Sequence, residues 1–286
     1  MQELISKAAT LLEALPYIQR FAGATFVVKY GGSFMDSPDE AVRTGVARDV
    51  VFLEAVEINP VVVHGGGKRI SRALEAAGIE TRFVNGLRYT DAESVQVVDR
   101  VLSLEINAEI VEMINSLGGE AKGFAGTEIF TCTQHAPDDE DYGFVGEVTA
   151  VNTAPLEDCI ALGITPVISP TARGADGQIY NCNADVAAAQ ADIALAAKRL
   201  VFMSDVPGLL REPGDDNSLI PHLDIAEVDA LKQAGIIASG MIPKVDSATT
   251  AIHAGVDKVS FVDGRIHHAV LLEIFTDKGV GTEIVK

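Results

Sequence analysis

Apolar and polar positions along the chain form a repeated pattern of strand, turn and helix. Two short β-rich runs, residues 25–30 and 60–64, are each stopped by a cluster of glycines. Helical spacing of apolar residues follows both clusters, through Val56 after the first and Ala77 after the second. A helix between two strands of this kind is typical of βαβ units. The pattern therefore predicts an α/β fold with a parallel sheet.

The rest of the chain continues this alternation. Strands are predicted at residues 166–170, 200–203 and 258–262, and helices over 95–117, 185–198, 266–275 and from residue 240. Residues 124–150 are β-rich and irregular, with a solvated hairpin tip predicted at the acidic stretch 138–141. Any boundary between two lobes is expected near residue 195, without a flexible linker.

An amphipathic helix precedes the first strand. Ile5, Ala8, Leu12 and Leu15 recur at helical spacing, and the pattern is predicted to end near Pro16. Because this helix lies before the first strand, it is an appendage to the domain behind it. Its apolar stripe either packs on the core or contacts another subunit, and the pattern alone leaves both readings open.

Composition narrows the class of protein. The chain has 286 residues, 48% of them hydrophobic, which suffices for one large α/β domain or two lobes that share a sheet. Its net charge of −19 disfavours a nucleic-acid surface. No apolar run or N-terminal leader predicts a membrane or secretory segment, so a soluble chain is expected. Three cysteines without metal-ligand spacing predict no resident metal and suit a reducing compartment such as the cytoplasm.

Glycines at the ends of the first two strands are candidate anion-binding turns. Gly31-Gly32 follows the first strand and Gly65-Gly66-Gly67 the second. In a parallel sheet, ligands bind at the carboxyl ends of strands, where glycine backbone and free helix amides can approach an anion. Two clusters favour a polyanion or two anionic ligands over simple tight turns. The motifs of a P-loop, a dinucleotide site and a nucleophile elbow are all missing from the sequence.

Two lysines are candidate cations at this edge. Lys29 lies in an otherwise apolar strand beside Gly31, and Lys244 lies near a predicted helix start. Each is either solvated or directed at a phosphate. Fixed cations suit phosphoryl transfer, where catalysis is mostly positioning and charge stabilisation.

Further polar residues have both a structural and a functional interpretation. Arg88 could grip a carboxylate or form a surface salt bridge. Asn181, Asn183 and Asp185 precede the alanine-rich helix; one of them is expected to cap it, which leaves the others for a ligand. Asp205 is either a turn former or a nucleotide contact.

Several short motifs occur in a fixed order along nearly the whole chain. They are Lys29-Tyr30-Gly31-Gly32, His64-Gly65-Gly66-Gly67, Asn85-Gly86-Leu87-Arg88, Gly143-Phe144-Val145-Gly146-Glu147-Val148, Asn181-Cys182-Asn183-Ala184-Asp185, Ser204-Asp205-Val206 and Gly240-Met241-Ile242-Pro243-Lys244. Each motif alone is weak, but the ordered set resembles the N-acetyl-L-glutamate kinases of the amino acid kinase family. Lys68-Arg69 departs from the pattern, because many relatives have a less basic pair there.

The resemblance implies a fold and an activity. It implies an open, mainly parallel sheet between helices, with an N-terminal oligomerisation helix over 1–20, an amino-acid-substrate lobe over 21–195 and a nucleotide-binding lobe over 196–286. ATP with Mg²⁺ would phosphorylate the γ-carboxylate of N-acetyl-L-glutamate in arginine biosynthesis. A γ-carboxylate with a pKa of about 4.3 is already ionised near pH 7 and needs no general base, so the lack of a catalytic His or Cys constellation is expected.

The resemblance also implies roles for individual residues. The catalytic set would be Lys29, Lys244, Asp185, Gly32 and Gly66; the acetylglutamate set Gly65, Gly66, Arg88 and Asn181; and the nucleotide set Gly31, Ser204, Asp205 and Lys244. Asp185 would orient the two lysines, and the amides of Gly32 and Gly66 would donate to the transferring group.

The two ends of the chain resemble the arginine-inhibited branch of the family. There the N-terminal helices link dimers into a hexamer, and arginine binds beside that junction. His268, Glu273 and Gly281 would hold the inhibitor, although Glu273 could instead lie on an exposed helix face. Some members also bind the PII signalling protein. The rival readings are a related kinase for another amino-acid carboxylate, a non-catalytic arginine sensor and, third, a dinucleotide oxidoreductase.

Overall fold

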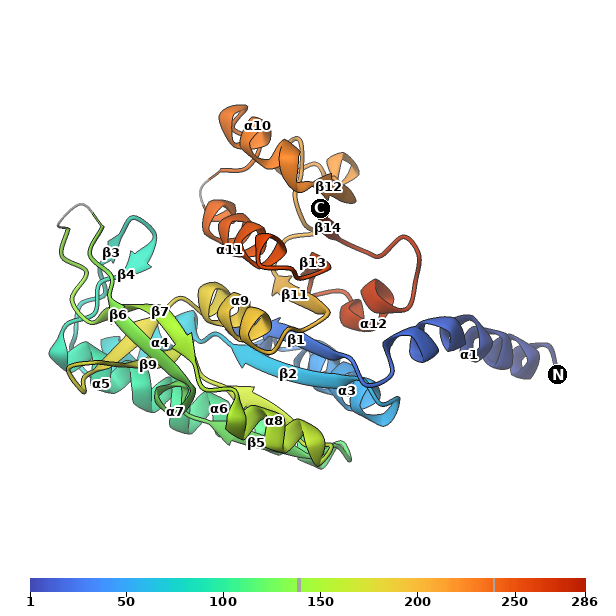
Figure 1. The fold of residues 1–286 in the computed structure, drawn as a ribbon, viewed down its shortest axis with the longest axis horizontal. Helices are drawn as coiled ribbons and strands as arrows, with labels where there is room; N and C mark the ends of the chain where they lie inside the picture. Colours follow the sequence, from blue (N-terminus) through green and yellow to red (C-terminus); the bar gives the residue numbers. More distant parts are fainter. Residues whose placement is uncertain (138–139, 239) are drawn as a thin grey trace.

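A central sheet organises the chain, whose computed structural model describes residues 1–137, 140–238 and 240–286 (Figure 1). The strands of this sheet are β1 (Thr25–Tyr30), β2 (Asn59–His64), β5 (Ala121–Phe124), β8 (Thr165–Ile168), β11 (Arg199–Ser204), β12 (His222–Asp224), β13 (Lys258–Asp263) and β14 (Thr282–Val285). Their order is β12-β14-β13-β11-β1-β2-β8-β5. Every neighbouring pair is parallel except β13 and β14. The predicted α/β fold with an open, mainly parallel sheet is confirmed.

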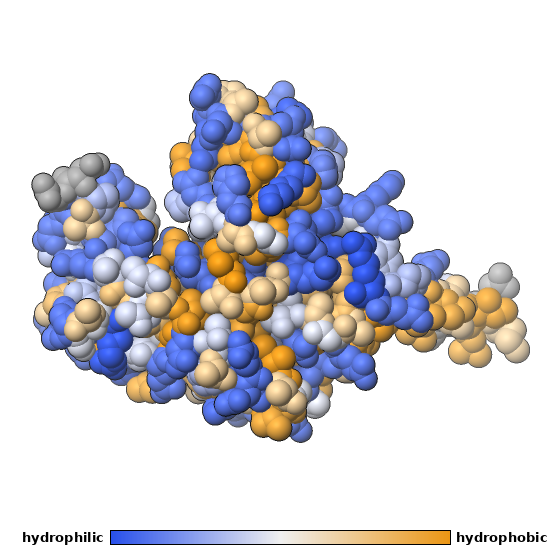
Figure 2. All heavy atoms as spheres, in the orientation of Figure 1, coloured by the Kyte–Doolittle hydropathy of each residue, from blue (hydrophilic) through white to orange (hydrophobic). Residues whose placement is uncertain are grey.

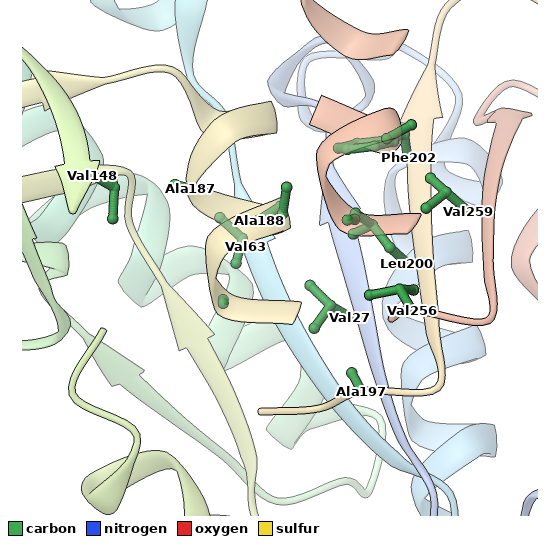
Figure 3. Close-up of a cluster of buried hydrophobic side chains, with 14 of the residues drawn as sticks. Val27, Val63, Val148, Ala187, Ala188, Ala197, Leu200, Phe202, Val256 and Val259 are labelled. Atoms are coloured by element: carbon green, nitrogen blue, oxygen red, sulfur yellow. The ribbon is translucent and has the colours of Figure 1, made fainter. Parts of the chain in front are cut away.

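Helices cover both faces of this sheet. They are α2 (Gly32–Met35), α3 (Glu40–Ala55), α4 (Gly67–Ala76), α5 (Ala92–Asp99), α6 (Asn107–Ser116), α7 (Gly126–Ile129), α8 (Ala154–Ala161), α9 (Ala184–Ala194), α10 (Val228–Gln233), α11 (Met241–His253) and α12 (Ala269–Ile274). Side chains of β1 alternate between the two cores, as the two-residue period of a strand requires. Val27 joins the core under α9 and α11 (Figure 3), whereas Phe26 and Val28 join the core under α3, α4 and α6.

A small barrel stands beside the sheet and forms part of the wall of the site. It closes from β6 (Phe130–Gln134), β7 (Val145–Val151), β9 (Thr171–Gly174) and β10 (Ile179–Cys182). A two-stranded hairpin, β3 (Phe83–Val84) and β4 (Leu87–Arg88), lies near it. The acidic stretch 138–141 connects the antiparallel strands β6 and β7, as expected for a hairpin, but its residues 138–139 lie outside the described part of the chain.

The N-terminal helix α1 (Gln2–Phe21) is longer than the sequence predicted. Pro16 lies inside it rather than at its end, because the turn beyond Pro16 is held by packing. The ring of Tyr17 contacts Phe275, and Phe21 is buried against Phe26. The rest of the helix projects from the body, and Figure 2 shows its apolar side chains uncovered. Core packing therefore accounts for only the last turn.

Three other predicted boundaries change. The alanine-rich helix ends at Ala194 rather than residue 198, because Ala196 takes a left-handed φ of 47°. The last helix begins only at Ala269, since His268 is left-handed at φ 59°. The helix predicted over 95–117 is α5 and α6 joined by a π-helical segment, η1 (Arg100–Ile106). Over the described ranges, no helix is both long and apolar enough to cross a membrane.

Candidate active site

Two lysines and one aspartate meet at the carboxyl edge of the sheet. Lys29 is on β1, Asp185 is in the first turn of α9, and Lys244 is in the first turn of α11. The Nζ of Lys29 lies 2.9 Å from Oδ1 of Asp185, and the Nζ of Lys244 lies 2.6 Å from Oδ2. Lys29 and Asp185 are buried, so the interpretation of Lys29 as a solvated strand end is wrong.

The charges of this cluster depend on one another. Burial alone would raise the pKa of Asp185, but the two neighbouring ammonium groups outweigh it and the pKa is lowered. Burial, together with repulsion from Lys29, lowers the pKa of Lys244 despite its contact with Asp185. One carboxylate thus faces two cations, which leaves the cluster with a net positive charge.

The two glycine turns lie side by side next to these cations. Strands β1 and β2 pair in register, and the Gly65 amide donates to the carbonyl of Tyr30 at 2.9 Å. Gly66 caps the N-terminus of α4, and Gly31 holds the same position on α2. A β-carbon at Gly66 would lie 2.6 Å from Cδ1 of Ile106 and 2.7 Å from Cδ2 of Leu102 in η1. A side chain at position 66 would therefore displace the ends of these two buried side chains or the turn itself.

Arg88 is a buried cation with neutral partners. It donates to the carbonyl of Gly67 at 3.0 Å, to Oγ of Ser71 at 2.9 Å and to Oγ1 of Thr81 at 3.3 Å. Among the described residues, none of the acidic side chains lies within ion-pair distance of it. Burial lowers the pKa of its guanidinium. The surface salt bridge considered for Arg88 is wrong, and the site offers a charge that an anionic ligand can match.

The polar residues before α9 divide their roles as the sequence suggested. Asn183 is the cap, because its side chain accepts from the amides of Asp185 and Val186. Asn181 donates through Nδ2 to Oγ1 of the buried Thr90 at 3.2 Å. The capping alternative therefore applies to Asn183, and Asn181 is left to face the cavity.

These residues line one cavity of about 330 Å³. Its walls include most of the predicted set, namely Lys29, Gly31, Gly65, Gly66, Arg88, Asn181, Asp185, Ser204, Asp205 and Lys244. Gly32 follows Gly31 as the first residue of α2. A second cavity of about 500 Å³ adjoins the first and shares Gly86, Leu87 and Val145 with it. Figure 2 shows this face hollowed between the hairpins and the lobe that carries α11.

The predicted arginine-site residues lie away from this cavity, around α12. Glu273 is buried and accepts from Oγ of Ser260 at 2.8 Å and from the amide of Val280 at 3.0 Å, so its exposed-face interpretation is wrong. His268 pairs with the buried Asp49 at 2.6 Å. A β-carbon at Gly281 would lie 1.9 Å from the carbonyl oxygen of Phe261, so this position requires glycine.

The sequence did not indicate the residues that hold Arg88, Asn181 and the Gly66 turn in place. Ser71 and Thr81 fix Arg88, Thr90 fixes Asn181, and Leu102 with Ile106 shape the Gly66 turn. No local motif marks these residues, because their contacts arise only when distant elements pack together.

Comparison with known proteins identifies the family of this chain. The model of the amino acid kinase family matches residues 24–263, so the chain belongs to the amino acid kinase family. Acetylglutamate kinase from Synechococcus elongatus is 48% identical over 275 residues, which cover 96% of this chain and 91% of the relative. Acetylglutamate kinase from Syntrophomonas wolfei is 45% identical and covers 98% of both chains. The resemblance to acetylglutamate kinases is confirmed.

Solved structures of several enzymes share the fold. N-acetylglutamate synthase from Neisseria gonorrhoeae, solved with coenzyme A and N-acetyl-glutamate, matches 98% of this chain at a TM-score of 0.86 and 25% identity. This chain spans 63% of the synthase's length. Carbamate kinase from Giardia lamblia bound to AMP-PNP has a TM-score of 0.68 at 14% identity, covering 93% of this chain and 99% of that one, which shows a common fold.

Proposed function

We propose that this protein transfers the γ-phosphoryl group of ATP to the γ-carboxylate of N-acetyl-L-glutamate, which forms an acyl phosphate for arginine biosynthesis. The observation that carries the proposal is the cluster of Lys29 and Lys244 on opposite oxygens of Asp185, in the wall of a cavity that also contains Arg88. The names of the full-length relatives support the choice of substrate.

The electrostatics of the cavity fit a reaction between two anions. The acceptor carboxylate and the γ-phosphate repel each other, and negative charge is spread over the transferring group. Fixed ammonium groups and backbone amides stabilise that charge without having to reorganise. Lys29, Lys244 and the amides of Gly32 and Gly66 would supply this stabilisation, and Asp185 would hold the lysines in place.

The amino-acid end of the substrate would bind at Arg88 and Asn181. A guanidinium can bind a carboxylate through two parallel hydrogen bonds, and Arg88 is already fixed by three neutral partners. Asn181 offers an amide beside it, and Gly65 and Gly66 lie at the reacting end. The residues over 21–195 would thus form the substrate lobe.

ATP would bind as the second substrate across residues 196–286, with Mg²⁺ carried on its phosphates. The donor set fits the polyphosphate, because Gly31, Lys244 and Ser204 line the same cavity as the Asp185 cluster. Asp205 is the exposed carboxylate at that end and would contact the nucleotide or its magnesium. A cation at the start of α11 is unfavourable for the helix dipole, and a bound phosphate would offset this effect at Lys244.

Regulation and assembly form the second part of the proposal. The uncovered apolar side chains of α1 would link dimers into a hexamer, and arginine would inhibit by binding at His268, Glu273 and Gly281. Binding of the PII protein would be a further control. The three buried free thiols fit a cytoplasmic enzyme.

Trapping the product with hydroxylamine tests the reaction. Hydroxylamine converts an acyl phosphate into a stable hydroxamate, so the protein with ATP, Mg²⁺ and N-acetyl-L-glutamate should accumulate the hydroxamate in step with ADP. Glutamate and aspartate serve as controls, since both lack the acetyl group. Hydroxamate from a control alone would favour a kinase for that amino acid. Release of ADP without hydroxamate would contradict carboxylate phosphorylation.

A further inference from the structure

Arg69 joins three segments around the two glycine turns. It lies in the first turn of α4, two residues after Gly67. Its Nε donates to Oδ1 of Asp36 at 3.1 Å, and its two terminal nitrogens grip the carboxylate of Glu109 on α6. Such a bidentate pair fixes orientation as well as distance. At 24% exposure, the Arg69 side chain is largely shielded from solvent.

The acceptor Asp36 lies four residues after Gly32 of the other glycine turn. It is the C-cap of α2, a four-residue helix that begins with Gly32. The Arg69–Asp36 contact therefore connects the segment that follows β1 to the segment that follows β2. These two segments carry the amides of Gly32 and Gly66.

Besides these polar contacts, α2 is held by two buried apolar residues, Phe34 and Met35. Its N-cap is Gly31, which has no side chain to accept a capping hydrogen bond. Phe34 anchors the middle of α2 by stacking on Tyr30, with ring centroids 6.3 Å apart, and by close packing on Gly264. The end of α2 is held through Asp36, where the exposed Arg72 adds a second contact. Of these two arginines, only Arg69 extends the contact to a third helix through Glu109.

We propose that Arg69 is a positioning residue that locks α2 to α4 and so fixes the separation of the Gly32 and Gly66 amides. The proposal rests on the function proposed above, in which both amides donate to the transferring phosphoryl group. Donors of this kind act through preorganised geometry, and a displacement of about 1 Å can cost on the order of a hundredfold in rate. Arg69 lies outside the lining of the cavity, so its effect would be transmitted through the two turns.

Hydrogen exchange tests the lock without reference to any substrate. In the Arg69→Met variant, we expect amides of residues 31–36 to exchange at least about fivefold faster than in the wild type, because open states of α2 become more populated. Arg72→Met removes the exposed contact alone and should change exchange less. Lys198→Met is the control, because it removes a surface ion pair to Asp257, and neither residue lies in the glycine turns or in η1. Unchanged exchange at residues 31–36 in Arg69→Met would overturn the proposal.

Steady-state kinetics test the consequence for catalysis. Loss of the lock should lower kcat by about tenfold to a hundredfold while KM for acetylglutamate stays within about twofold, because Arg88 and Asn181 are untouched. Asp36→Asn should reproduce the effect, and Arg69→Lys should show part of it, since a single ammonium lacks the planar fork that binds Glu109 through two nitrogens while Nε reaches Asp36. Faster exchange with normal kcat would overturn the positioning role. Absence of turnover in the wild type would refute the proposed function instead, and only the exchange result would then report on the lock.

Discussion

Lys29 and Lys244 lie on different elements of the fold and are bridged by the two oxygens of one buried carboxylate, that of Asp185. Two cations close to each other in a partly buried site would repel without that bridge. The shared carboxylate contacts both side chains at the wall of one cavity and offsets their mutual repulsion. This arrangement explains how a chain with a net charge of −19 can present a local positive site for two anionic substrates.

Removing one of these cations should cost catalysis far more than stability. Lys29→Ala should lower kcat by on the order of a hundredfold, comparable to the loss of one oxyanion donor. Lys198→Ala is the control, because Lys198 forms a surface ion pair with Asp257, and it should leave kcat unchanged. Initial-rate measurements of ADP release give both values. A Lys29→Ala enzyme with normal kcat would remove Lys29 from the catalytic set.

Replacing the buried guanidinium should weaken substrate binding. Arg88→Lys keeps the charge but loses the planar fork, and it cannot reach Gly67, Ser71 and Thr81 together. We expect KM for acetylglutamate to rise by about tenfold to a hundredfold, as for the loss of a hydrogen bond to a charged group, while KM for ATP changes little. Arg82→Lys, at an exposed position nearby, is the control. An equal rise in both KM values would show that Arg88 supports the site as a whole.

The Gly66 turn should not accept a side chain. In Gly66→Ala the new β-carbon would overlap the terminal methyl groups of the buried Leu102 and Ile106, so either these side chains or the turn must shift. We expect activity to fall by at least about tenfold. Gly45→Ala in α3 meets open space and should raise the free energy of unfolding by about 0.5–1 kcal/mol. Activity assays and urea unfolding compare the two variants, and an active Gly66→Ala enzyme would contradict the packing argument.

His64 should make the protein less stable in mild acid. Complete burial lowers its pKa from the ordinary 6.5 to about 4, so the folded protein keeps it neutral while the unfolded chain binds a proton. Its contribution to the free energy of unfolding therefore falls by about 1.4 kcal/mol per pH unit between pH 6.5 and 4. Urea unfolding over this range should show a smaller pH dependence for His64→Gln than for wild type. The exposed His253→Gln should keep the wild-type dependence.

The projecting part of α1 should be dispensable for catalysis but not for assembly. Deletion of residues 1–16 retains the buried Phe21 and Tyr17, whose hydroxyl bonds Asp277. The truncated protein should be active, smaller in multi-angle light scattering and less sensitive to arginine. A point variant, Leu12→Asp, is a milder test of the same exposed stripe. An unchanged oligomer in both variants would exclude α1 as the junction.

The reactive edge of the site could be predicted from sequence because it depends on local order. Lys29 and the glycine turns follow strands directly, and the carboxyl ends of parallel strands share one edge. The partners of Arg88 and Arg69 could not be predicted from the sequence. Ser71 reaches Arg88, and Asp36 and Glu109 reach Arg69, only through tertiary packing.

Errors at element boundaries have equally physical causes. The sequence placed a helix end at Pro16, where packing of Tyr17 and Phe21 carries α1 onward. It extended the last helix to residue 266, where the left-handed backbone of His268 prevents helix formation.

Phosphorylation of N-acetyl-L-glutamate by ATP is tested most directly by measuring the release of ADP. The wild-type protein is supplied with ATP, Mg²⁺ and either N-acetyl-L-glutamate, glutamate or aspartate as acceptor. We expect steady turnover with N-acetyl-L-glutamate alone and its suppression by millimolar arginine. Turnover that arginine leaves unchanged would keep the kinase and remove the inhibitor site. No turnover with any acceptor, together with saturable binding of arginine, would contradict the account and leave an arginine sensor on a kinase fold.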